Sequence, residues 1–146
     1  MEDTAFASSE WKPALRTIAD KIATESRRAM ASGKGPDNYN WRPLNEDYAQ
    51  RKGSRSMMVL SGKLRSQAGN ADNAITLLTN RKLKYEVKAK YATTHQFGSS
   101  PNKGTGFPGA RVRNYLIWGD ELKKLVFDTL NDYGAHRRRQ IMKRLR

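Results

Sequence analysis

Two stretches of the chain place apolar residues at helical spacing. The first stripe consists of Trp11, Leu15, Ile18 and Ile22, with Ala19, Ala23 and Ala29 beside it. Because residues three or four apart share one face of a helix, this pattern predicts an amphipathic helix from about Ser9 to Ala31. A serine at position 8 or 9 is the expected N-cap, Pro13 falls in the first turn, and the Gly-Pro segment 33–36 ends the helix.

The second stripe lies towards the end of the chain and consists of Leu122, Leu125, Val126, Thr129, Leu130 and Tyr133. It predicts an amphipathic helix with Asp120 as its N-cap, ending or kinking at Gly134. Beyond it, residues 137–146 hold six Lys or Arg and no acid. Ile141 and Leu145 are four residues apart, so this tail can extend as a basic helix, if only on binding a partner.

Alternation with a period of two predicts strands between the helices. From 83 to 90, Leu83, Tyr85, Val87 and Ala89 alternate with charged residues, mostly lysine, which gives one buried face and one basic face. Segment 74–79 reads as a second short strand and 80–82 as the hairpin turn between them. We also expect a short strand at 115–118, a short helix at 45–52, a short helix or turn at 61–64, and long loops at 32–43 and 98–109.

Composition limits the classes of protein that the chain can form. It has 146 residues, of which 37% are hydrophobic, and its mean hydropathy is −0.85. A core of that size is small for the length, and such chains often complete their burial against copies of themselves. The chain has no cysteine, two histidines, no long apolar run and no signal-peptide pattern at its start. We therefore expect neither disulfides nor a metal site nor a membrane anchor, and a location in the cytoplasm where it is made.

The formal net charge of +14 is unevenly distributed. Residues 1–72 hold 12 Lys or Arg against 9 Asp or Glu, a net of +3, whereas residues 73–146 hold 16 against 5, a net of +11. We expect the second half to face something anionic, either nucleic acid or an acidic protein partner, although any single cation can equally be a solvated surface charge. The candidate contacts are Lys84, Lys88, Lys90, Arg111, Arg113, Arg137, Arg138, Arg139, Lys143 and Arg144.

Catalytic chemistry has little support. His95 with Ser61 or Ser66 lacks a G-x-S-x-G elbow and an orienting carboxylate. The acid pairs at 46–47 and 120–121 both sit where a helix should begin, which the helix dipole explains without metal or acid–base chemistry. The glycines of 98–109 match no nucleotide-binding loop. We predict no catalytic residue, no metal site and no cofactor.

Four short motifs follow one another in a fixed order. They are Trp41-Arg42-Pro43-Leu44, then Tyr48 with Lys52, then Ser61-Gly62-Lys63-Leu64, then Tyr91-Ala92-Thr93-Thr94-His95-Gln96-Phe97-Gly98. In their order and spacing, over roughly residues 11 to 133, the chain resembles the tail completion (virion morphogenesis) proteins of tailed phages.

The resemblance implies an α+β fold, in which a small antiparallel sheet is flanked by N-terminal and C-terminal helices, in a single domain with long loops. We expect that domain to span 1–133, with 134–146 as a basic C-terminal extension. Within it, the residues expected to pack in the core or anchor loops, without contacting a ligand, are Trp41, Leu44, Tyr91 and Phe97.

The resemblance also implies a structural protein, not an enzyme, that completes the tail as a terminator or neck ring and helps join tail to head. The expected partners are copies of the chain in a hexameric ring, tail tube proteins, neck or head–tail connector proteins, and packaged DNA by nonspecific contact. The expected location is the virion, in the tail or neck. The alternative is a basic protein that binds nucleic acid through its phosphates. Such binding would have no sequence preference, because no helix-turn-helix, RRM or zinc pattern is present.

Overall fold

The computed structural model describes residues 11–36, 38–44, 46–53, 62–100 and 112–144. Six helices and two strands occur within these ranges, in the order α1 (Lys12–Ser32), α2 (Glu46–Lys52), α3 (Lys63–Ala68), α4 (Ala71–Ala74), β1 (Ile75–Leu78), β2 (Leu83–Tyr85), α5 (Ala92–Phe97) and α6 (Gly119–Arg144). The antiparallel β1–β2 sheet and the long first and last helices confirm the expected α+β fold.

The first helix follows its sequence pattern closely. Pro13 lies at the start of α1, where a missing N–H costs no hydrogen bond. At the other end Gly33 adopts a left-handed φ of 68°, and its N–H bonds the Ala29 carbonyl at 3.0 Å. The serines expected to cap the helix lie outside the described residues.

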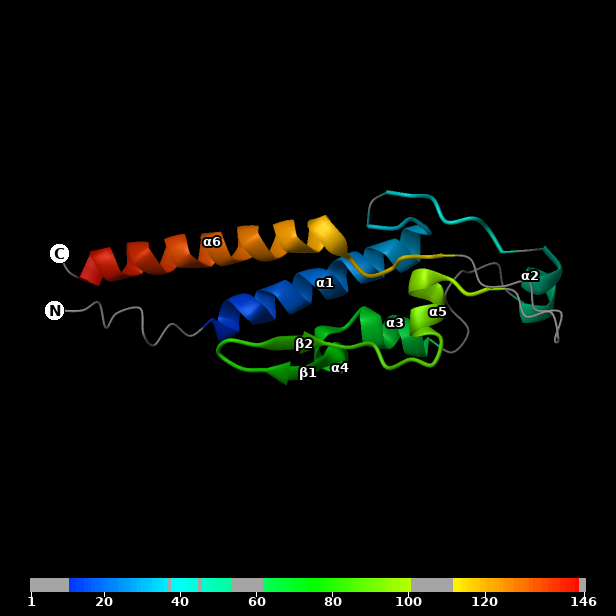
Figure 1. The fold of residues 1–146 in the computed structure, drawn as a ribbon, viewed down its shortest axis with the longest axis horizontal. Coiled ribbons are helices and arrows are strands. Elements are labelled where there is room, and N and C mark those ends of the chain that lie inside the picture. Colours follow the sequence, from blue (N-terminus) through cyan, green and yellow to red (C-terminus); the bar gives the residue numbers. More distant parts are fainter. Residues whose placement is uncertain (1–10, 37, 45, 54–61, 101–111, 145–146) are drawn as a thin grey trace.

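The elements form three layers with α1 in the middle (Figure 1). The β1–β2 hairpin, α3 and α4 lie on one side of α1, and α6 runs antiparallel to α1 on the other. On the hairpin side, Ala19 and Ala23 are buried against Ala71, with Ile75, Leu83 and Tyr85 packed around them. Alanine lets the helix approach the hairpin closely, so this part of the core is thin.

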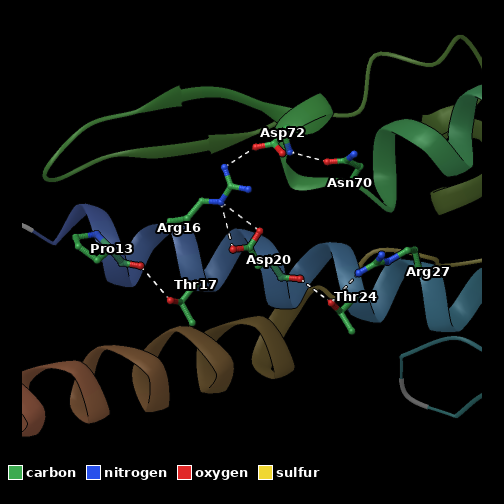
Figure 2. Close-up of polar contacts among 8 residues, drawn as sticks. All are labelled: Pro13, Arg16, Thr17, Asp20, Thr24, Arg27, Asn70 and Asp72. Atoms are coloured by element: carbon green, nitrogen blue, oxygen red, sulfur yellow. Dashed lines mark hydrogen bonds and ion pairs between the residues drawn. The ribbon is translucent and has the colours of Figure 1, made fainter.

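Charged groups join α1 to α4 above that core (Figure 2). The Arg16 guanidinium donates to both carboxylate oxygens of Asp20 at 3.2 Å and to Oδ1 of Asp72 at 2.6 Å. The hydrogen bond and the charge of Arg16 hold the pKa of Asp72 below its usual value. Asn70 caps α4 by accepting from the Asp72 N–H at 2.9 Å. These groups are exposed, so the network orients α4 on α1 and contributes little stability.

A second core cluster lies towards the C-terminal end of α1. Its buried members are Ala29, Met30, Trp41, Leu64, Ala68, Ala89, Ala92 and Tyr115. Trp41 is 4% exposed, and its backbone N–H donates to the Gly33 carbonyl at 2.8 Å, so the loop after α1 folds back onto the core. Leu44, three residues on, is half-buried.

The predicted hairpin forms, but its second strand is shorter than expected. Ile75 pairs with Tyr85 and Leu78 with Leu83. Past Tyr85 the neighbouring backbone belongs to α4, and the Glu86 N–H bonds the carbonyl of Ala74 there. A helix offers no further strand to pair with, so the ladder stops. The inward side of the predicted alternation nevertheless continues, since Val87 is half-buried and Ala89 buried while Lys88 and Lys90 are exposed; Glu86, predicted to face outward, is half-buried.

Three further predictions are wrong. Segment 115–118 is not a strand, because a side chain of α5 takes up its backbone hydrogen bonds. The last helix does not end at Gly134 but continues to Arg144, and Asp120 lies inside its first turn instead of capping it. One interior glycine costs a helix only about 1 kcal/mol relative to alanine, which its neighbours outweigh.

Candidate functional site

Outside the layers of helices, the side chain of Gln96 on α5 forms three hydrogen bonds that clamp a later segment of the backbone. Its Oε1 accepts from the N–H groups of Tyr115 and Leu116, both at 3.1 Å. Its Nε2 donates to the Leu116 carbonyl at 3.2 Å. Gln96 is 7% exposed, so these bonds form away from water and fix the approach to α6 onto α5.

Tyr115 reinforces this clamp. Its ring is 1% exposed, its hydroxyl donates to the Ala92 carbonyl at 3.3 Å, and burial raises its pKa to about 12. Two residues earlier, the Arg113 N–H donates to the His95 carbonyl at 2.7 Å. Segment 113–116 is therefore bonded to α5 at successive points.

The clamp brings two aromatic side chains together at the surface. Phe97 ends α5 and Trp118 precedes α6, and their rings meet edge to face with centroids 6.2 Å apart. Phe97 is 59% exposed and Trp118 66% exposed. Two large apolar rings left in water side by side mark a surface suited to contact with another protein.

Comparison of the sequence with protein families identifies a family that covers most of the chain. Residues 3–133 match the phage virion morphogenesis family. The chain belongs to that family. No curated protein and no solved structure matches it.

Membership of the virion morphogenesis family assigns the chain a structural or assembly role in a phage particle. The motifs that carried the resemblance occupy distinct places in the fold. Trp41 lies in the core, Gly62 precedes α3, and the segment from Tyr91 to Gly98 forms α5 with its two flanking residues. The family motif containing His95 and Gln96 is therefore the element that makes the clamp.

Two of the four expected anchors are exposed in this family member. Tyr91 is 55% exposed and Phe97 59% exposed, so their expected burial is wrong for the single chain. The reason is the direction of α5, which turns Gln96 and Ala92 inward. On so short a helix the neighbouring side chain must then point outward.

The basic candidates that precede α6 lie in different environments. Lys84 forms an ion pair with Glu86 at 2.9 Å, which holds the pKa of that carboxyl below its usual value. Lys88 and Lys90 are exposed. Arg113 is only 9% exposed, so its expected place on a partner-facing surface is wrong. Arg111 lies outside the described residues.

The remaining candidates gather on one element. They are Arg137, Arg138, Arg139, Lys143 and Arg144, all on the last turns of α6. The sequence allowed this tail to extend as a basic helix, and the structure shows it as the continuation of α6 to Arg144.

Sequence reasoning missed Trp118 and Tyr115 as site residues because it placed both on a strand. The signal that could have found Gln96 is its place beside Phe97 in the motif that forms α5. Within the described part of the chain, no group of three or more His, Asp or Glu is placed to hold a metal ion. No helix there has the length and apolarity needed to cross a membrane.

Proposed function

We propose that this protein completes the phage tail, as a terminator or neck ring, and helps join the tail to the head. The observation that carries the proposal is the family match, which spans nearly the whole chain. A structural role of this kind needs surfaces for other proteins and no catalytic group, and the Phe97–Trp118 pair is such a surface.

Self-association into a hexameric ring is part of the proposal. Its support is the incomplete burial of the single chain. Thr129 is the one buried residue of α6, although the helix carries an apolar stripe. Phe127, on the same helix, is 66% exposed. Large apolar side chains that a subunit leaves in water are commonly covered by neighbouring subunits.

A deletion of the protein from its phage tests the role directly. We expect particles whose tails fail to join heads, or tails of uncontrolled length, seen by negative-stain electron microscopy. Cryo-electron microscopy of intact virions should locate the subunit at the end of the tail tube or in the neck. Fully infectious virions with normal necks in the absence of the protein would disprove the assignment.

The second candidate function is a free protein that binds nucleic acid without sequence preference. The net charge of +14 and the basic end of α6 favour it. It predicts a monomer or dimer that binds duplex DNA tightly, whereas the tail proposal predicts a ring in the absence of DNA. Light scattering at modest salt, with and without DNA, separates the two.

A further inference from the structure

The C-terminal part of α6 extends beyond the helix that it packs on. Trp11, directly before α1, lies against Tyr133 with ring centroids 5.8 Å apart. Since α1 and α6 are antiparallel, residues 134–144 continue past the start of α1 (Figure 1). At 1.5 Å per residue this extension is about 16 Å long. None of its side chains is buried.

This extension carries five cations and no acid. Arg137 reaches back to the Tyr133 hydroxyl at 3.4 Å. Arg138, Arg139, Lys143 and Arg144 form no ion pair or hydrogen bond with any residue that the structure describes. The helix C-terminus favours cations in its last turn, which accounts for Lys143 and Arg144 but not for the three consecutive arginines.

The first half of the same helix is built differently. Lys123 pairs with Asp120 at 2.9 Å and Lys124 with Asp128 at 2.6 Å, and the Asp128 carboxylate raises the pKa of Lys124. If solubility were the only requirement, balanced pairs of this kind would meet it, and they also stabilise the helix. In the extension Arg139 and Lys143 stand one turn apart with like charge, which costs helix stability unless an anion compensates.

The cations also surround the helix. At 100° per residue, Arg137, Arg138 and Arg139 point in three directions, with Lys143 on the side of Arg139 and Arg144 on the side of Arg137. A protein surface meets one side of a helix, whereas the major groove of duplex DNA admits a helix and has phosphates on both walls.

A second copy of the chain offers little to this extension. Most of the carboxylates on its described surface are already ion-paired within their own chain: Asp20, Glu25, Asp72, Glu86, Asp120 and Asp128. An arginine from another copy would therefore compete with an existing cation at each of them.

We infer that residues 134–144 of α6 bind duplex DNA through its phosphates, with no preference for base sequence. The inference deepens the proposed function by naming DNA as a partner. It rests on that function only in taking packaged phage DNA as the DNA that is bound. Binding itself is a property of the purified chain.

The test is fluorescence anisotropy with a labelled duplex of mixed sequence over a series of salt concentrations. We expect log K to fall linearly with log salt, with a slope of about −3 to −5 for the four or five phosphates that these cations can neutralise. Duplexes rich in A·T or in G·C should bind equally well.

The decisive variant replaces Arg138, Arg139 and Lys143 by Gln, a good helix former. It should weaken binding at least tenfold at low salt and reduce the salt slope by about 3. The matched control replaces Lys84, Lys88 and Lys90 by Gln, which removes the same charge on the far side of α1. It should bind within about twofold of the unchanged chain. Circular dichroism confirms that both remain folded.

Three results would overturn the inference. The first is that the unchanged chain does not bind duplex DNA at low salt. The second is that the control loses as much affinity as the α6 variant. The third is that the α6 variant loses self-association in the absence of DNA while its DNA affinity stays the same. The last outcome would assign the extension to an acidic surface on another copy. None of them bears on the deletion phenotype, so the tail assignment stands or fails separately.

Discussion

Gln96 holds the backbone of Leu116 at both of its polar groups, accepting from the N–H at 3.1 Å and donating to the carbonyl at 3.2 Å. A single side chain thereby replaces the strand neighbour that an extended segment would otherwise need. It also sets where α6 begins and places Trp118 beside Phe97.

Replacing Gln96 by Ala should lower the free energy of unfolding by about 1–3 kcal/mol, because buried backbone groups lose their partners. Urea denaturation followed by circular dichroism measures this. Thr93→Ala, an exposed change on the same helix, is the control and should have little effect. Equal stability of the two variants would show that the clamp does not operate in solution.

Trp41 and Trp118 make a matched pair of tryptophans with opposite environments. Trp41→Ala should cost about 3–5 kcal/mol, since a ring that is 4% exposed leaves a cavity. Trp118→Ala should cost about 1 kcal/mol or less in dilute protein, because its ring is 66% exposed. An unchanged melting temperature for Trp41→Ala would contradict its place in the core.

The Phe97–Trp118 pair should matter for assembly more than for folding. Changing both residues to Ser should reduce ring formation, measured by light scattering, while the melting temperature of the subunit changes little. Leu77→Ser, which alters an apolar side chain of β1 that is 44% exposed, serves as the control and should leave assembly intact. Normal assembly by the double variant would remove this pair from the subunit interface.

Gly134 tests the continuity of α6. A Cβ at this position meets nothing within 4 Å, and the residue lies inside the helix. Gly134→Ala should therefore strengthen the helix by about 1 kcal/mol, seen as a larger helical signal in circular dichroism. Gly134→Pro should weaken it by about 3 kcal/mol. A smaller helical signal for the alanine variant would mean that the helix does break there.

Two tyrosines, Tyr85 half-buried and Tyr115 buried, predict a loss of stability in alkali. Burial raises the pKa of Tyr85 and of Tyr115 from 10.0 to about 12. The folded state then holds these protons more tightly than the unfolded state, so stability is fully present below pH 10 and falls as the pH rises towards 12.

Urea denaturation across that range measures the alkaline fall. Tyr115→Phe removes one of the two groups and should make the fall shallower, although losing the hydroxyl bond to Ala92 lowers the starting stability by about 1 kcal/mol. A fall of equal steepness in the double Tyr85→Phe, Tyr115→Phe variant would contradict this account.

Local patterns in the sequence determined the elements whose structure depends on local interactions. The stripe from Trp11 to Ile22 predicted α1, because helical periodicity over several turns leaves only one face to bury. The alternation after Leu83 predicted which side chains face inward, even where no strand pairing exists. The cluster of cations from Arg137 onward was evident from the sequence alone.

Only the tertiary structure decided which member of a short motif faces the core. In α5 the expected anchor Phe97 is exposed and Gln96 is buried, because segment 113–116, about twenty residues later in the chain, docks on that side. The same docking abolished the strand expected at 115–118. A six-residue helix has too few turns for its own periodicity to fix an inward face, so a contact between distant segments fixed it.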